Sequence, residues 1–345
     1  MTEIEWLPIQ AGRVTIGDSR GALMYVNNGP LHQINIVTDF EISSTPITYV
    51  QWATLTGQPA AGNKSDEQMN CLTPLMIESA LNSFEKITID YEEIISGDEG
   101  LKKWLEQLHY LGISLVKNAP TEKDSGFDVL KNISHHRETF FKTPFQVIDI
   151  PNPNNSAYTA KDLRNHIDLP YYEIAPGYQF LHCLINEAAG GQSIAVDGFR
   201  VALYLKENFN DYFNILLNTP VKFVNRDYTA NTIRVMHAPL ITLDRNNDFN
   251  DIRFSASYMG VMDCSPDKMD KFYIAYRKLL ELLHDEKFEI NFRLEPGDIY
   301  SFNNRRVLHG RKEYDPNSGE RHLQGYYIDR DEIIGRLNFL NKVNP

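Results

Sequence analysis

The sequence predicts an α+β protein that is mainly antiparallel β, with helices packed outside the strands. Strand-like stretches fill much of the C-terminal half, at residues 288–294, 298–304 and 321–329. The first two of these stretches are separated by the turn Pro296-Gly297-Asp298. Stretches with helical periodicity do not alternate regularly with the strand-like stretches, as they do in parallel sheets. This pattern favours antiparallel sheets.

The N-terminal part differs in character from the rest of the chain. Its strand-like runs lie at residues 13–18, 31–42 and 46–57. Residues 59–69 are small and polar, which is typical of a linker. We therefore expect a small β-rich N-terminal appendage over 1–58, a linker over 59–69 and one large domain over 70–345.

Two helices in the large domain are indicated by their apolar spacing. Residues 98–110 carry Leu101, Trp104, Leu105 and Leu108 at helical spacing. A second helix over 265–285 opens with Ser265 as N-cap and Pro266 at the first helical position. Its predicted apolar face consists of Met269, Phe272, Tyr276, Leu279, Leu280 and Leu283.

Other elements are predicted from local pattern. Residues 112–120 indicate a buried strand that ends at a proline. Residues 178–185 and 193–197 are strand-like and flank a loop with two glycines, which predicts a hairpin over 178–197. A helix over 198–209 is expected to follow it.

Composition excludes several classes of function. The formal net charge of −12 disfavours sequence-independent nucleic-acid binding and docking to anionic membranes. No run of about 18 apolar residues is present, so no bilayer span is expected. The first ten residues have no basic stretch of the kind that a secretory signal needs. Cys71, Cys183 and Cys264 form no disulfide pattern, and we expect a cytoplasmic protein.

A candidate metal site begins at His166 and Asp168. On a strand or at its end, residues i and i+2 point to the same side, so imidazole and carboxylate can converge on one cation. A second histidine, His309, would complete a set of two histidines and one carboxylate. That set leaves positions open for a bidentate co-substrate and O2 at Fe(II). Arg321, on the next strand-like run, could pair with a distal carboxylate.

With these residues in place, the sequence resembles a known family from about residue 90 to residue 340. It is similar to the γ-butyrobetaine dioxygenase and trimethyllysine dioxygenase branch of the taurine-dioxygenase-like Fe(II)/2-oxoglutarate oxygenases. The resemblance is carried by NNSAYTAKDLRNHIDLPYY, PGYQFLHCLINEAAGGQSIAVDGFR, EPGDIYSFNNRRVLHGR and RHLQGYYIDRD. It implies a distorted double-stranded β-helix, a jelly-roll-like core that agrees with the antiparallel pattern.

The resemblance also implies roles for individual residues. His166, Asp168 and His309 match the iron ligands and Arg321 matches the arginine that binds the 5-carboxylate of 2-oxoglutarate. Ser193 matches a hydroxyl that assists it, although a serine in a hairpin turn is an equal interpretation. The implied reaction consumes O2, converts 2-oxoglutarate to succinate and CO2, and hydroxylates a substrate C–H bond.

The family holds a trimethylammonium group in an aromatic cage by cation–π attraction. The matching positions for the cage and for the substrate's acid group are Phe141, Phe145, Tyr158, Tyr327, Asn155 and Ser255. The sequence departs from the family at Pro144, where an acid is usual, and at Ser255, where an asparagine is usual. These changes favour a related betaine, methylated amino acid or other small zwitterion over γ-butyrobetaine itself.

Several alternatives stay open at this point. The same cofactor chemistry could end in desaturation, demethylation or cyclisation, and a non-catalytic metal- or ligand-binding barrel is a different class. We expect His135, His136 and His182 to be surface or core histidines rather than ligands. The partner is expected to be a small molecule, and the N-terminal appendage to be structural or to form a homodimer.

Overall fold

The structure is a computed structural model that describes residues 6–9, 12–16, 32–36, 40–43, 87–149, 159–228, 230–262 and 264–342. The chain divides into two compact units, Met1–Ser83 and Phe84–Pro345. In the first unit, β1 (Trp6–Ile9) pairs antiparallel with β4 (Phe40–Ser43), and β2 (Gly12–Ile16) with β3 (His32–Ile36). The predicted strand over 46–57 and the predicted linker lie outside the described residues, so the predicted domain boundaries stay a prediction.

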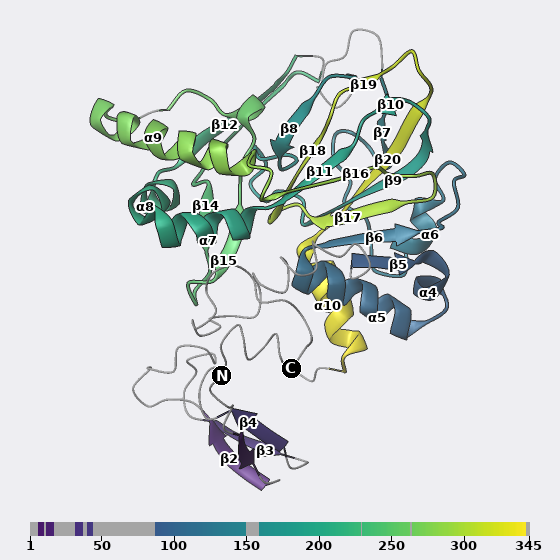
Figure 1. Cartoon of the computed structure of the whole chain (residues 1–345), viewed down its shortest axis with the longest axis vertical. Coiled ribbons are helices and arrows are strands. Elements are labelled where there is room, and N and C mark those ends of the chain that lie inside the picture. The colour runs from purple at the N-terminus through teal and green to yellow at the C-terminus, as the bar shows by residue number, and fades with distance from the viewer. Residues whose placement is uncertain are drawn as a thin grey trace. The chain divides into compact units, whose positions relative to one another are not determined.

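The second unit is built on two sheets (Figure 1). The four-stranded sheet has, in spatial order, β16 (Glu289–Phe292), β11 (Ser193–Asp197), β18 (Val307–Arg311) and β8 (Leu163–His166). The six-stranded sheet has, in order, β5 (Thr88–Asp90), β6 (Ile113–Lys117), β17 (Ile299–Asn303), β9 (Tyr178–Asn186), β20 (Arg321–Ile328) and β7 (Phe145–Val147). Only the β5–β6 pair is parallel among these strands. The predicted mainly antiparallel architecture is confirmed.

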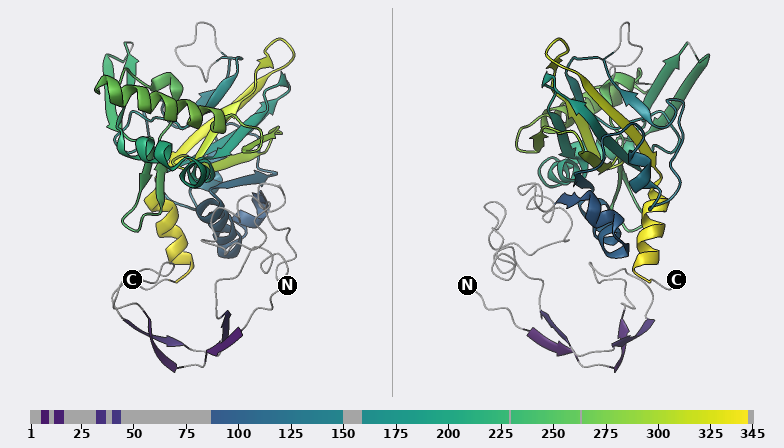
Figure 2. Two further views of the ribbon diagram at one scale, coloured as in Figure 1. Left: turned by 60° about the vertical axis from the view of Figure 1, so that its left-hand side comes forward. Right: turned by 90° about the vertical axis from the view of Figure 1, so that its right-hand side faces the viewer.

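Helices and short strand pairs surround these sheets (Figures 1 and 2). The short pairs are β10 (Ala189–Gly190) with β19 (Tyr314–Asp315), β12 (Val221–Asp227) with β13 (Thr232–Ala238), and β14 (Ile241–Leu243) with β15 (Phe249–Ile252). The helices are α4 (Tyr91–Ile95), α5 (Asp98–Glu106), η1 (Gln107–Leu111), α6 (Gly126–Leu130), α7 (Gly198–Asn208), α8 (Asn210–Asn218), η3 (Ala256–Tyr258), α9 (Pro266–Leu283) and α10 (Arg330–Leu340). None of the described helices combines the length and the apolar content needed to cross a membrane.

The helices predicted from apolar spacing are present. Helix α5 buries Leu101, Trp104 and Leu105, and its last turn continues as the π-helical turn η1, which buries Leu108. Helix α9 begins at Pro266, as predicted, and buries Phe272, Tyr276, Leu279 and Leu283 among its apolar residues. Helix α7 matches the prediction over 198–209 to within one residue. Period-3.6 patterns in this sequence were therefore reliable guides to local structure.

The predicted hairpin over 178–197 is wrong. β9 lies between β17 and β20 in the six-stranded sheet, whereas β11 lies between β16 and β18 in the other sheet. The glycine loop therefore carries the chain from one sheet to the other. Gly190 has φ 94, and a Cβ there would lie 2.6 Å from the carbonyl oxygen of Glu313, so a glycine is required at this corner.

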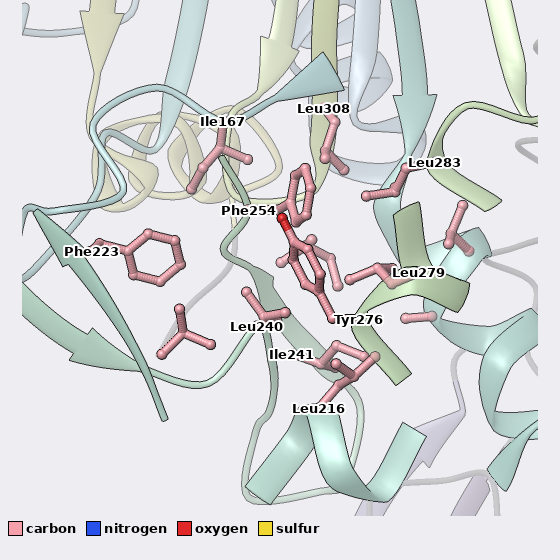
Figure 3. Close-up of a cluster of buried hydrophobic side chains, with 14 of the residues drawn as sticks. Ile167, Leu216, Phe223, Leu240, Ile241, Phe254, Tyr276, Leu279, Leu283 and Leu308 are labelled. Carbon is pink, nitrogen blue, oxygen red and sulfur yellow. The ribbon is translucent and has the colours of Figure 1, made fainter. Parts of the chain in front are cut away.

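Two hydrophobic clusters hold the second unit together. One joins α5 and α10 to the six-stranded sheet and includes Trp104, Phe180, Tyr326 and Leu337. The other lies among α7, α8, α9 and the four-stranded sheet and is shown in part in Figure 3. Ile167 and Leu308 belong to this second cluster and are 1% and 0% exposed. Each is a direct neighbour of predicted iron ligands in the sequence.

Candidate active site

The three predicted iron ligands converge on one point. His166 ends β8, and its Cα partner across the strand pair is His309 of β18, so both side chains lie on the same face of the sheet. Their ring centroids are 4.3 Å apart. Oδ1 of Asp168 lies 3.3 Å from Nε2 of His166 and 3.8 Å from Nε2 of His309. All three candidate ligand atoms lie within 4.8 Å of one another.

Strand alternation explains why these side chains face inward together. Ile167 lies between His166 and Asp168 and points into the hydrophobic cluster, as does Leu308 beside His309 (Figure 3). Because successive residues of an extended chain point to opposite sides, burying these two apolar residues turns the ligands the other way. The hydrophobic core therefore fixes the orientation of the metal-binding groups.

The protonation states of the triad suit a divalent cation. Nδ1 of His166 donates to the carbonyl oxygen of Arg164 at 2.8 Å, which leaves the lone pair of Nε2 for a metal. Burial lowers the pKa of His309 to about 3, so its imidazole is neutral. Burial disfavours the charged form of Asp168, but the adjacent His166 and His309 side chains and the hydrogen bond from the Tyr327 hydroxyl outweigh burial and hold its pKa well below the usual range. Two imidazole nitrogens and one ionised carboxylate are the donor set of non-haem Fe(II) sites.

Asn304 fixes the backbone of Asp168 and was missed by sequence reasoning. The N–H of Asp168 donates to Oδ1 of Asn304 at 2.8 Å, and the carbonyl of Asp168 accepts from Nδ2 at 3.1 Å. Nδ2 of the same asparagine also donates to the carbonyl of Pro176 at 3.2 Å. Asn304 is fully buried, so these hydrogen bonds are shielded from competition with water. Leu169, the next residue after Asp168, has φ 55, which shows how sharply the chain turns here.

Tyr327 reaches the triad from the opposite sheet. Its hydroxyl donates to Oδ2 of Asp168 at 2.6 Å, while its backbone belongs to β20. Burial and the neighbouring Asp168 charge raise the pKa of Tyr327 well above its ordinary value, so the phenol remains a proton donor. This contact connects the six-stranded sheet directly to a candidate metal ligand.

A cavity of about 160 Å³ adjoins the triad. His166 and Asp168 line it, as do four of the predicted substrate-binding residues, Phe141, Phe145, Ser255 and Tyr327. Tyr171 and Tyr258 also line it, with ring centroids 4.8 Å apart, and neither was anticipated. The remaining predicted substrate residues, Asn155 and Tyr158, lie outside the described residues.

The aromatic wall of this cavity depends on one glycine. The rings of Phe145 and Tyr327 are stacked with centroids 5.0 Å apart, and Phe141 lies 6.3 Å from Phe145. Phe145 is the Cα partner of Gly325 on β20, and a Cβ at Gly325 would overlap the Phe145 ring. The missing side chain at 325 therefore lets the ring lie flat against the strand.

Charged groups at the cavity are few. Besides His166 and Asp168, the residues Asp162 and Arg164 line the wall, with Oδ2 of Asp162 3.2 Å from Nε of Arg164. Pro144 is part-buried at the position where the resemblance leads one to expect an acid. The aromatic part of the wall thus offers ring faces to a ligand, with no added carboxylate from residue 144.

Arg321 is a buried cation without an acidic partner among the described residues. It is the first residue of β20, is 7% exposed, and its Nε and Nη1 make no hydrogen bond within the described chain. Its guanidinium carbon lies 5.4 Å from the Tyr314 ring centroid. Burial, together with repulsion from Arg311, lowers the pKa of Arg321 to about 10, so it stays charged at neutral pH. A buried, unpaired guanidinium suits a ligand carboxylate, as 2-oxoglutarate would provide.

Ser193 and the other histidines can be placed as well. Ser193 starts β11, is buried, and lies on the same face of the sheet as His309, since Ala195 is the Cα partner of His309. Neither Ser193 nor Arg321 lines the described cavity. Other histidines considered from the sequence lie apart from the triad: His135 and His136 are exposed, and His182 is buried in β9, where burial lowers its pKa to about 4.

Comparison with known proteins agrees with this site. Residues 74–327 match the model of the family described as taurine catabolism dioxygenase TauD, TfdA family. The chain is 37% identical to γ-butyrobetaine dioxygenase of Pseudomonas sp. over 253 residues, which are 73% of this chain and 66% of that enzyme. It is 28% identical to trimethyllysine dioxygenase of Meyerozyma guilliermondii over 74% of this chain and 65% of that enzyme. The chain thus spans just under two thirds of the length of these two relatives.

The fold also has a counterpart among solved structures. Asparagine oxygenase, solved in complex with Fe(II), 2S,3S-3-hydroxyasparagine and succinate, superposes with a TM-score of 0.53 at 14% sequence identity. That likeness covers 75% of this chain and 92% of the asparagine oxygenase chain, and it confirms the predicted jelly-roll fold. The relatives confirm the predicted likeness to the γ-butyrobetaine dioxygenase and trimethyllysine dioxygenase branch. The chain belongs to the taurine catabolism dioxygenase TauD, TfdA family.

Proposed function

We propose that this protein is an Fe(II)/2-oxoglutarate-dependent dioxygenase that hydroxylates an unactivated C–H bond of a small zwitterionic metabolite. 2-Oxoglutarate is converted to succinate and CO2 in the same turnover. The observation that carries the proposal is the triad of His166, Asp168 and His309, two members of which, His166 and Asp168, line a cavity with aromatic walls. A structural metal would be enclosed by its ligands, whereas this donor set leaves coordination positions open.

The chain's own residues would bind and orient the reactants. His166 and His309 would supply neutral imidazole nitrogens and Asp168 one carboxylate oxygen, and Fe(II) bound there would supply the oxidative chemistry. Arg321 would hold the 5-carboxylate of 2-oxoglutarate by a charge-assisted hydrogen bond, with the Ser193 hydroxyl as second donor. The unpaired nitrogens of buried Arg321 support this role.

The cavity favours a substrate with an alkylated ammonium group. Phe141, Phe145 and Tyr327 present rings to it, and rings attract cations through their quadrupole by about 0.5–2 kcal/mol per good contact. Ser255, buried at the cavity wall, would donate to the substrate's acid group. Its short hydroxyl replaces the longer amide expected from the family, so a betaine or amino-acid-like compound of altered length fits this wall better than γ-butyrobetaine. Asn155 and Tyr158 complete the proposed substrate contacts.

We also propose that the enzyme acts in the cytoplasm as a homodimer. The free thiols of Cys183 and Cys264 suit a reducing compartment. Residues 1–58 form the proposed dimer-forming appendage. Light scattering on the full chain at several concentrations tests the dimer, and a mass that stays at one chain throughout would contradict it.

The oxygenase reaction can be tested without knowing the substrate. Under anaerobic conditions, 2-oxoglutarate is titrated into the Fe(II)-loaded protein together with γ-butyrobetaine, trimethyllysine, other betaines or methylated amino acids. After O2 is admitted, the amount of succinate is compared with the amount of oxidised product by mass spectrometry. Hydroxylation adds the mass of one oxygen atom to the substrate. Absence of succinate with every candidate and without any substrate, in a protein that binds Fe(II), would contradict the proposed function.

A further inference from the structure

We propose that Tyr327 is a positioning residue that makes Asp168 bind the metal through one oxygen only. This inference rests on the metal site proposed above. Oδ1 of Asp168 faces both histidines, at 3.3 Å from Nε2 of His166 and 3.8 Å from Nε2 of His309. Oδ2 instead accepts the hydrogen bond of Tyr327 at 2.6 Å. The two oxygens of one carboxylate therefore have different partners before any metal binds.

Both members of this hydrogen bond are held from several sides. The backbone of Asp168 is fixed by the two hydrogen bonds to Asn304, at 2.8 and 3.1 Å. Tyr327 is 2% exposed, is paired with Gln179 of β9 through the backbone, and stacks on Phe145 with ring centroids 5.0 Å apart. Because neither partner can turn away without breaking these contacts, the hydrogen bond selects one carboxylate orientation.

The consequence concerns the number of open positions at the metal. A carboxylate that binds through one oxygen leaves, together with two imidazoles, three positions free, which a bidentate co-substrate and O2 require. If Oδ2 also bound, the carboxylate would occupy one of those positions and compete with 2-oxoglutarate. The Tyr327 hydroxyl thus keeps a coordination position open for 2-oxoglutarate, while the ring of the same residue forms part of the cavity wall.

The test separates the hydroxyl from the ring. Tyr327→Phe keeps the ring and removes only the hydroxyl, and Tyr326→Phe is the matched control. Tyr326 is the adjacent residue of β20, its ring lies in the other hydrophobic cluster, and its hydroxyl bonds Oε1 of Gln324 at 3.2 Å. Each protein is loaded with Co(II), whose absorption spectrum reports coordination number, and 2-oxoglutarate is then titrated in the absence of O2.

We expect Tyr327→Phe to bind Co(II) with an altered spectrum and to bind 2-oxoglutarate about 10- to 100-fold more weakly, as loss of a hydrogen bond to a charged group predicts. Tyr326→Phe should match the wild type in both measurements. A Tyr327→Phe protein with wild-type spectrum and wild-type 2-oxoglutarate affinity would overturn the positioning role. Circular dichroism and the melting temperature verify that the variants are folded.

Two further variants distinguish a loss of the Tyr327 hydroxyl from a change in packing and from a wrongly assigned metal site. Phe145→Leu removes the ring that stacks on Tyr327 but leaves the hydroxyl, so the Co(II) spectrum should stay close to wild type; a spectrum like that of Tyr327→Phe would assign the effect to packing instead. His309→Ala reports on the metal site itself. If His309→Ala binds Co(II) as the wild type does, the metal site is misassigned and the positioning role is overturned with it.

Discussion

The metal triad and the aromatic cavity lie side by side but are built in different ways. Two of the triad residues are cross-strand partners in one sheet, and the third follows two residues after one of them. The cavity wall instead gathers residues from four segments: β7 and the turn before it, β8 and the residues that flank it, the helix η3 with Ser255 before it, and β20. A group held by strand pairing has few ways to move, whereas a wall assembled from four segments can change one residue at a time. The sheet therefore fixes the positions of the candidate metal ligands, whereas the segments of the cavity wall determine which ligand the cavity accepts.

The most severe change is expected at the triad. His309→Ala removes a neutral imidazole ligand that strand pairing holds opposite His166. We expect metal affinity to fall by more than the about 10- to 100-fold that loss of an outer-shell partner costs, and 2-oxoglutarate turnover to disappear. Metal titration and succinate release measure this, with exposed His136 changed to Ala as a control. Normal 2-oxoglutarate consumption by His309→Ala would show that the ligand assignment is mistaken.

The next largest effect is expected at Arg321. Removing one partner of a buried charge pair costs about 3–5 kcal/mol, so Arg321→Ala should bind 2-oxoglutarate several hundred-fold or more weakly while retaining the metal. Calorimetric titration of the Co(II)-loaded protein measures this loss. Arg321→Lys serves as the comparison, since it keeps the charge but loses the bidentate geometry. An unchanged affinity in Arg321→Ala would mean that another cation anchors the co-substrate.

A third change tests whether the core and the site are separable. Leu308 is a neighbour of His309 but points into the hydrophobic cluster (Figure 3). Leu308→Ala should therefore lower the free energy of unfolding by about 2–5 kcal/mol and leave metal binding of the folded protein intact. Urea denaturation and metal titration on the same sample distinguish the two properties. Weak metal binding in a fully folded Leu308→Ala protein would show that core packing and ligand placement are coupled.

The smallest effect is expected in the cavity wall. Phe141→Ala removes one ring face, so binding of a cationic substrate should weaken by about 0.5–2 kcal/mol. Binding of an isostere with tert-butyl in place of trimethylammonium should change less, because it carries no charge for the ring to attract. Tyr258→Phe, which changes the same cavity wall without removing a ring face, serves as the control. Equal losses for the charged and the neutral ligand would identify the wall as a purely hydrophobic surface.

The sequence was most informative where local pattern and chemistry coincide. The spacing of His166 and Asp168 predicted their convergence, and helical periodicity predicted the buried faces of α5 and α9. The predicted hairpin failed because alternation and a glycine loop are the same for a hairpin and for a corner between two sheets. Which strands pair is decided by packing over the whole domain, and a local window of sequence does not contain that information.

Three residues of the candidate site were not predicted from the sequence. Asn304 and Tyr171 lie close to His309 and Asp168 in the sequence, and Tyr258 lies far from both, but no local pattern marks any of the three as part of the site. Asn304 stands in the block that carries the family resemblance, yet only its hydrogen bonds to Asp168 reveal what it does. The role of the Tyr327 hydroxyl was likewise hidden, because a ring position can be inferred from a pattern but the atom that a phenol reaches cannot.

The pairing of His309 with His166 has a consequence for how this segment can change in length. Side chains of a strand alternate with a period of two, so inserting one residue between Val307 and Leu308 would turn the His309 imidazole toward the core and Leu308 toward the candidate metal site. A substitution in β18 changes one side chain, whereas a single-residue shift would exchange the roles of every side chain beyond it. Insertions should therefore be tolerated in the wall segments around η3 long before any is tolerated in β18.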